Sequence, residues 1–334
     1  MTLDLVPLWA CILSLAVLMY VLLDGFDLGV GMLFFFRRHD EDRDLMVASV
    51  APIWDFNETW LVLGSGGLLA VFPLAFSIIM PAVYFPILLM LLGLLFRGVA
   101  FEFRDVPRAR KHVWNTAFAW GSLIATFSQG VVLGNFIRGF PVNGRIYAGT
   151  SWDWIAPFPL LTGVGLIVGY CLLGATWLVM KTEGDLQEWA RRMARWLLLG
   201  LLAFILMVSV WTPLEEPRIA ERWFSFPNLL YFAPVPILTL VIAATLWHAL
   251  STKRDMLPFL CAMGLFFLSY TGLIISLWPY VAPPSITLWD AATAPMSQQF
   301  LMVGTMFLLP VILLYVFWSY WVFRGKVRGD IGYH

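Results

Sequence analysis

Four acidic residues interrupt long apolar stretches of the sequence, and their types and spacing suit proton transfer. Asp24 and Asp27 lie near the end of the first apolar stretch, and Asp55 and Glu58 lie near the start of the second. Each pair has the i,i+3 spacing that places both side chains on one face of a helix. Carboxyl groups in a partly dry environment can accept and release protons near neutral pH. These four residues are therefore the candidate catalytic groups of the chain, as members of a proton path.

A third apolar stretch carries Arg97 and Glu102 near its end. Five carboxylates against one guanidinium would leave an excess of four negative charges if every group were ionised. Burial and like charges both favour the neutral form of a carboxyl group, so we expect some of the acids to carry protons near neutral pH. We predict that Arg97 and Glu102 tune the charge of the proton path.

The composition indicates which elements must position these groups. Of the 334 residues, 60% are hydrophobic and 13% are charged, and apolar runs recur from end to end. We therefore predict an all-α, polytopic integral membrane protein whose residues 1–334 form a single transmembrane domain. Charged and Pro-rich breaks separate nine segments, each near the ~20 residues that cross a bilayer as a helix. The segments span about 6–34, 49–71, 75–101, 113–136, 156–180, 195–213, 228–249, 257–280 and 298–323.

The basic residues orient these segments. Sixteen of the 21 Lys and Arg residues fall in one set of breaks and four in the opposite set, while Arg97 lies within the third segment. Because Lys and Arg concentrate on the cytoplasmic side of membrane proteins, we predict an N-terminus outside and a C-terminus in the cytoplasm. The acids of three consecutive segments then share one depth, in the cytoplasmic part of the membrane. A charge at the bilayer centre costs roughly 3 kcal/mol, so we expect these acids to face protein or water rather than lipid.

Structural roles are the alternative for the same residues. The glycines of residues 24–31 (DGFDLGVG) permit close packing of helices around Asp24 and Asp27. Asp55 and Glu58 could instead stabilise the positive end of a helix whose first turn contains Pro52. Because ionisable residues inside membranes are generally functional, we favour the proton path for the cluster as a whole.

Metal, haem and nucleic-acid sites are not predicted on this chain. Cys11, Cys171 and Cys261 are isolated on separate apolar segments, without the spacing of a zinc or iron–sulfur site. The four histidines fall in or beside the cytoplasmic breaks, so none is placed to ligate a haem between helices. Basic and acidic residues are equal in number, which gives no net positive field for a nucleic acid.

Seven short stretches, in order along nearly the whole chain, resemble subunit II of the cytochrome bd-type quinol oxidases, in particular the cyanide-insensitive branch. They are residues 24–31 (DGFDLGVG), 52–60 (PIWDFNETW), 96–104 (FRGVAFEFR), 128–134 (SQGVVLG), 174–184 (GATWLVMKTEG), 288–292 (LWDAA) and 323–326 (FRGK). The predicted count of nine helices with an external N-terminus agrees with that family. One departure is Phe56, where many relatives have glycine, and a bulky ring beside Asp55 would alter helix approach or narrow a water route.

The resemblance implies a partner, subunit I, that carries two b-type haems, haem d and the quinol-oxidising loop, while this subunit binds no haem itself. The complex would oxidise quinol, reduce O2 to water and generate proton-motive force in the bacterial cytoplasmic (inner) membrane. In some family members the acids matching Asp24, Asp27 and Asp55 are assigned to proton delivery toward the oxygen-reducing haem. A structural quinone or lipid is associated with this subunit in some members, which makes Trp54 a candidate contact. A small single-helix subunit is a further candidate partner.

Two other functions remain open on the sequence alone. Carboxylates that face a membrane cavity also serve proton-coupled secondary transporters, whose distinguishing feature would be paired broken helices in related halves of the chain. The chain could also be a purely structural subunit that stabilises haem-bearing helices and moves no protons.

Overall fold

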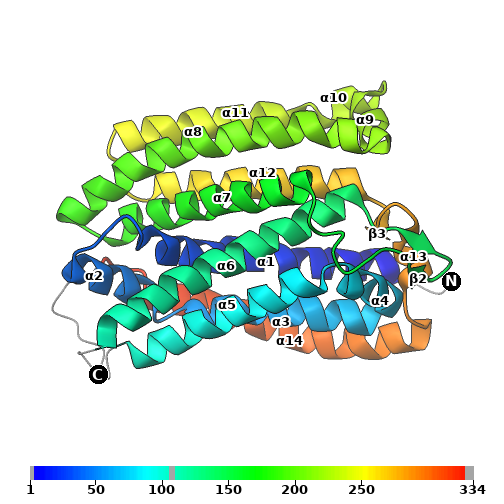
Figure 1. Ribbon diagram of the computed structural model, residues 1–334, viewed down its shortest axis with the longest axis horizontal. Helices are drawn as coiled ribbons and strands as arrows, with labels where there is room; N and C mark the ends of the chain where they lie inside the picture. Colours follow the sequence, from blue (N-terminus) through cyan, green and yellow to red (C-terminus); the bar gives the residue numbers. More distant parts are fainter. Residues whose placement is uncertain (1–3, 105–109, 328–334) are drawn as a thin grey trace.

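A computed structural model describes residues 4–104 and 110–327 and shows a bundle of long helices (Figure 1). Eight of the described helices are long and apolar enough to cross a membrane, and a bent pair adds a ninth span if it counts as one. The eight are α1 (Val6–Leu33), α5 (Tyr84–Phe103), α6 (Lys111–Arg138), α7 (Pro157–Lys181), α8 (Gly184–Glu215), α10 with α11 (Asn228–Phe232 and Pro234–Ser251), α12 (Leu257–Leu277) and α14 (Pro295–Val322). The prediction of an all-α, polytopic membrane protein is confirmed.

The bent pair consists of α3 (Trp54–Val71) and α4 (Pro73–Ala82), and the direction of the helix changes by 119° at the break between them. Pro73 begins α4, and because proline has no N–H to donate, it cannot continue the hydrogen-bond ladder of α3. The chain therefore turns sharply at this point.

Short elements lie at both ends of the bundle (Figure 1). At the end where α1 begins are two antiparallel hairpins and one helical turn: β1 (Val142–Asn143), β2 (Ile146–Tyr147), β3 (Tyr280–Ala282), β4 (Ile286–Thr287) and α13 (Leu288–Ala291). There α4 packs against β2, β3 and α13, and α9 (Pro217–Phe224) joins α8 to α10. At the opposite end, which is the predicted cytoplasmic end, lies α2 (Asp40–Val50).

Three predicted segments have different bounds in the structure. The second, expected at about 49–71, begins at Trp54, because residues 40–50 form the separate charged helix α2. The third, expected at about 75–101, is divided into α4 and α5 at Val83. The sixth, expected from about 195, begins at Gly184. Its first turns are polar, so they lie outside the apolar run from which its start was predicted. The other six segments agree with the structure to within three residues.

The spanning helices form two groups that share α7 as a common wall. α1 packs against α3 and α6, and α5 packs against α6, while α7, α8, α11 and α12 pack together; α7 also contacts α1 and α6. α1 and α7 approach closely at Gly29, where a Cβ atom would lie 1.8 Å from the carbonyl oxygen of Tyr170. The second half of α1, from Leu22 onward, is completely buried. Asp24 and Asp27 therefore face protein rather than lipid.

The segment that follows α14 is attached to the end of α7. Lys181 Nζ donates to the carbonyl oxygens of Phe323 and Gly325, the second at 3.1 Å. The N–H of Val327 donates in return to the carbonyl oxygen of Lys181 at 2.8 Å. α14 lies beside α3, outside both groups of helices (Figure 1), so this attachment supplements its sparse helix packing.

Asp255, in the loop between α11 and α12, completes the attachment. Lys326 Nζ donates to its carboxylate at 2.7 Å, and Arg191 of α8 forms a second ion pair with it. Burial raises the pKa of Asp255, but Lys326 and Arg191 outweigh burial and hold that pKa below its ordinary value.

We expect Asp255→Asn to lower the thermal unfolding midpoint of the purified protein at neutral pH. A carboxyl group whose pKa is depressed by folding stabilises the fold above its ordinary pKa and loses that contribution as the pH falls through the folded value. The difference from wild type should therefore shrink as the pH falls below about 4. Asp185→Asn, which alters an exposed carboxylate at the start of α8, should leave the midpoint nearly unchanged. A difference that stays constant with pH would contradict this assignment.

Candidate functional site

Arg97 of α5 joins two of the predicted acids inside the first group of helices. Its Nη1 donates to Asp24 Oδ1 on α1, and its Nη2 donates to Glu58 Oε2 on α3 at 2.8 Å. Arg97 and Asp24 are fully buried, whereas 28% of the Glu58 side chain is exposed. Asp27 follows Asp24 by one helical turn and is also fully buried. We call Asp24, Asp27, Glu58 and Arg97 the acid cluster.

Asp27 is held by residues of α3 and α14. Asn57 Nδ2 donates to Asp27 Oδ2 at 2.7 Å and lies 3.3 Å from the carbonyl oxygen of Leu23. The Asn57 side-chain oxygen in turn accepts a hydrogen bond from the Tyr320 hydroxyl at 2.9 Å. Asn57 and Tyr320 therefore form a hydrogen-bonded link from the peripheral helix α14 to the acid cluster.

Several buried polar atoms of the acid cluster have no hydrogen-bond partner within the described ranges. They are Asp24 Oδ2, Asp27 Oδ1 and Arg97 Nε. Buried polar atoms normally have partners, and a water molecule or a proton on a carboxyl group would supply them here. Three carboxylates around one guanidinium would also leave two negative charges uncompensated away from water, and each bound proton removes one of them. The geometry therefore suits groups that gain and lose protons.

A second hydrogen-bonded chain begins one turn before Asp24. Gln129 Nε2 of α6 donates to the Tyr20 hydroxyl at 2.7 Å, and the Tyr170 hydroxyl of α7 donates to Gln129 Oε1 at 2.9 Å. Thr126, one turn before Gln129, is fully buried, and its hydroxyl has no partner in the part of the chain that the structure describes. Polar side chains thus continue from the acid cluster toward α7.

Two of the six predicted site residues lie outside the acid cluster. Asp55 is exposed on α3, one turn before Glu58, and Glu102 is exposed on α5. A helix advances about 100° per residue, so Glu102 lies roughly 140° around α5 from Arg97. Asp55 and Glu102 therefore do not join the buried cluster, because only one side of each helix faces the core.

Trp54 packs against the acid cluster from the predicted cytoplasmic end. Its ring stacks on Phe101 with centroids 4.9 Å apart, and the Arg97 guanidinium carbon lies 6.0 Å from its centroid. Phe56, the residue that departs from the expected pattern, contacts Tyr315 of α14 edge to face at 4.7 Å. The bulky ring at position 56 therefore fastens α14 to α3.

Asn57 and Tyr320 are functional candidates that the sequence reasoning did not identify. Asn57 has a detectable signal, because it is a polar amide between two acids in an apolar helix. Tyr320 has none, because its segment contains several aromatic residues and only the folded position of α14 distinguishes it.

The positions of the His, Cys, Asp and Glu side chains bear on metal and haem binding. Within residues 4–104 and 110–327, no group of three His, Cys, Asp or Glu residues is placed to hold a metal ion. Three histidines are described: His39 precedes α2, His112 lies in the first turn of α6, and His248 lies in the last turn of α11. All three described histidines therefore lie at or beside the ends of helices.

Comparisons with known proteins agree on one family. The family model described as cytochrome bd terminal oxidase subunit II matches residues 5–323. The chain is 29% identical over 364 residues to cytochrome bd-I ubiquinol oxidase subunit 2 of Escherichia coli (strain K12), covering 97% of this chain and 95% of the relative. It is 29% identical over 333 residues to cytochrome bd ubiquinol oxidase subunit 2 of Bacillus subtilis (strain 168), covering 96% of each. A chain of the bd oxidase from Geobacillus thermodenitrificans has a similar fold, with a TM-score of 0.80 at 17% identity, covering 96% of this chain and 99% of that chain.

Proposed function

The chain belongs to the cytochrome bd terminal oxidase subunit II family, and from this premise we propose that it supplies protons to a partner subunit that reduces O2. The protein is a subunit of a quinol oxidase, an oxidoreductase complex of the bacterial inner membrane. The observation that supports a proton-supplying role is the acid cluster, in which two buried carboxylates and the partly exposed Glu58 surround one buried guanidinium, and two carboxyl oxygens lack partners in the described residues.

The proposed path runs from the surface of α3 into α1. Asp55 is exposed and lies one turn from Glu58, whose side chain is partly exposed, so the two carboxylates offer a route from water to the buried cluster. The Arg97 guanidinium donates to both Glu58 and Asp24, and Asp27 lies one helical turn after Asp24 on α1. Arg97 offsets the negative charge of its neighbours, so that protons can leave again. Glu102, exposed near the end of α5, adds negative charge at the predicted cytoplasmic surface.

The partner completes the chemistry that this chain does not carry. We propose that subunit I holds two b-type haems and haem d and receives electrons from quinol. This division suits the present chain, because its described histidines lie at helix ends where they do not fit axial ligands. An exposed Asp55 would be costly against lipid, so the outer face of α3 should meet protein or water, and we place the partner there. We also propose a small single-helix subunit as a further partner. A quinone or a lipid would contact the exposed part of Trp54.

Purification of the tagged chain from its native membrane tests the assignment. We expect a haem-containing partner to copurify, and the preparation to consume O2 when quinol is added. A colourless single-chain preparation would contradict the proposal and would favour a transporter. The structure gives that alternative little support, because one bent helix pair occurs among the described helices and transporters of this kind have a matching pair in each half.

Tyr320→Phe tests the link between α14 and Asp27. The substitution removes the hydroxyl that donates to Asn57, which leaves a buried amide oxygen short of a donor at a cost of about 1–3 kcal/mol. We expect O2 consumption to fall several-fold and its pH profile to shift, while the haem spectrum of the complex stays unchanged. Tyr315→Phe is the matched control, because Tyr315 lies on the same helix and is 51% exposed. Equal activity of both variants would exclude a role for the link.

A further inference from the structure

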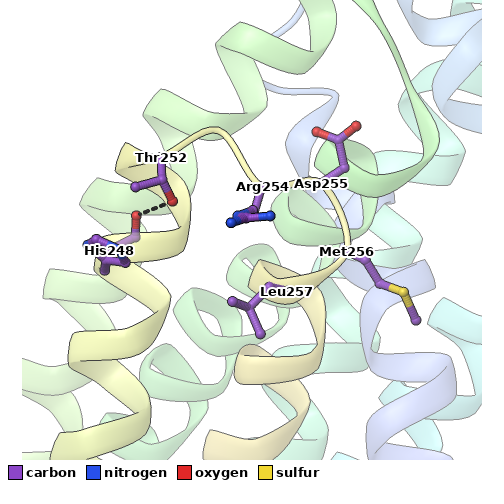
Figure 2. A pocket seen from close by; sticks show the side chains of 6 residues that line it. All are labelled: His248, Thr252, Arg254, Asp255, Met256 and Leu257. Carbon is purple, nitrogen blue, oxygen red and sulfur yellow. Dashed lines mark hydrogen bonds between the residues drawn. The ribbon is translucent and has the colours of Figure 1, made fainter.

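A cavity opens in the loop between α11 and α12 at the predicted cytoplasmic end of the bundle. Its volume is about 520 Å³. Figure 2 shows its lining residues, with the Arg254 side chain beneath the arc of the loop and the Asp255 carboxylate turned away from it. The lining comprises His248, Thr252, Arg254, Asp255, Met256 and Leu257. Cavities of this size commonly accommodate small ligands.

The loop conformation brings Arg254 back toward the end of α11. Lys253 has a φ of +55°, in the left-handed region, and the N–H of Arg254 donates to the carbonyl oxygen of Ala249 at 3.0 Å. The Thr252 hydroxyl donates to the carbonyl oxygen of His248 at 2.9 Å. The chain thus folds over the last turn of α11, so that Arg254 and His248 line the same space (Figure 2).

The charged side chains on either side of Arg254 in the loop form ion pairs, whereas the Arg254 side chain forms none within the described residues. Lys253 pairs with Glu188 at 2.8 Å, and the Asp255 carboxylate is occupied by Arg191 and Lys326. Within the described residues the Arg254 guanidinium has no hydrogen-bond or ion-pair partner, and only the backbone N–H and carbonyl of this residue are engaged. Among the residues that the structure describes, the cavity is therefore lined by a guanidinium without an ion-pair partner, by the His248 imidazole and by a carboxylate that already pairs with two cations.

The surroundings of the cavity are those of a membrane boundary. α11 ends at Ser251 and α12 begins at Leu257, so the loop lies where two spans leave the bilayer. Apolar side chains are exposed directly beside it, including Trp247 at 43%, Met256 at 59% and Leu260 at 48%. At this depth a ligand meets a cationic group at the cavity and an apolar surface along the adjoining spans.

We propose that this cavity binds the headgroup of an anionic phospholipid. The guanidinium of Arg254 presents paired N–H donors that match the geometry of a phosphate, and the His248 ring offers a further donor. The acyl chains then lie along the exposed apolar side chains of α11 and α12. Basic pockets between spans at the cytoplasmic side suit such headgroups, and the adjoining apolar surface favours a lipid over a free anion.

Lipid retention by the intact complex tests this site. The complex is delipidated, titrated with phosphatidylglycerol or phosphatidylcholine in neutral detergent, and the lipid bound per complex is counted by native mass spectrometry. We expect Arg254→Gln to retain about fivefold less phosphatidylglycerol than wild type at subsaturating lipid, with no change for phosphatidylcholine. Arg192→Gln is the matched control, because Arg192 is exposed on α8 at the same end of the bundle and does not line the cavity.

Two outcomes of the lipid titration would overturn the proposal. One is equal retention of phosphatidylglycerol by wild type and Arg254→Gln, and the other is an equal loss in Arg192→Gln, which would indicate a general effect of surface charge. A separate titration with inorganic phosphate distinguishes the two sources of phosphate. Binding of inorganic phosphate that depends on Arg254, without retention of the lipid, would identify a free-anion site and would likewise contradict the proposal. Arg254→Lys, which keeps the charge and loses the paired donors, should retain an intermediate amount of lipid.

Discussion

We expect the replacement of Asp27 by Leu to lower the O2 consumption of the complex at least about tenfold and to leave the haem spectrum of the partner unchanged. The side chain is fully buried and is the last carboxyl group of the proposed path from Asp55, so its loss removes a proton carrier that the packed protein around it cannot replace. A positioned acid or base typically contributes about 10²–10⁴-fold to a proton-transfer step, which makes a tenfold loss a conservative expectation. Quinol-driven O2 consumption and a reduced-minus-oxidised spectrum of the same preparation provide the measurement.

Two further variants separate proton transfer from packing at the same position. Asp27→Asn keeps the shape of the side chain and an acceptor for Asn57 but carries no exchangeable acidic proton, so it should be nearly as slow as Asp27→Leu. Asp27→Glu retains the carboxyl group and should recover part of the activity. Normal turnover in Asp27→Asn would leave this residue with a structural role only.

We expect the replacement of Arg97 by Leu to reduce strongly both the amount of assembled complex and its thermal unfolding midpoint. The guanidinium is fully buried and serves both Asp24 and Glu58, so its removal leaves two carboxylates without their cation. Breaking a buried ion pair by removing one partner costs about 3–5 kcal/mol, a large part of the stability of a typical domain. The yield of haem-containing complex and its unfolding midpoint measure the effect.

A double variant shows whether charge rather than packing explains the loss. Asp24→Leu combined with Arg97→Leu removes both fully buried charges of the pair and should restore a substantial part of the midpoint. Arg145→Leu, which changes an exposed arginine between β1 and β2, should alter the stability by no more than about 0.5 kcal/mol. If the double variant were as unstable as Arg97→Leu alone, the uncompensated charge would not be the cause.

The membrane spans could be predicted because apolar length alone specifies them. Six segments agree with the structure to within three residues, since lipid forces every backbone group of a span into a helix. The break between α4 and α5 at Val83 could not be placed in the same way, because the sequence remains apolar on both sides of it. The start of α8 was predicted too late in the sequence, because the first turns of this helix are polar and lie outside the apolar run.

The acid cluster could be predicted in part, for reasons that its contacts explain. The spacing of the acids along each helix and their common depth in three consecutive spans indicated that the side chains of the cluster lie close together. These residues are Asp24, Asp27, Glu58 and Arg97. Tyr320 could not be found, because it is 263 residues away from Asn57 in sequence and only the position of α14 beside α3 joins them.

The same reasoning could not show that Asp55 is exposed on α3. A spacing of i,i+3 leaves Asp55 and Glu58 about 60° apart on the helix, but the buried residues beside them, Asn57 and Trp60, lie roughly 140–160° around the helix from Asp55. The sequence therefore indicated that the two acids share a side of α3 but could not show which side is buried.

Proton uptake by the fully reduced complex during its reaction with O2 tests the central claim most directly. A pH-indicating dye follows the protons, and the haem absorbance of the partner follows the electrons in the same sample. We expect wild type to take up protons as the haems are oxidised, and Asp27→Leu to slow that uptake at least about tenfold while the first electron transfer to O2 keeps its rate. Proton uptake at the wild-type rate in Asp27→Leu would contradict the claim that the acid cluster carries protons.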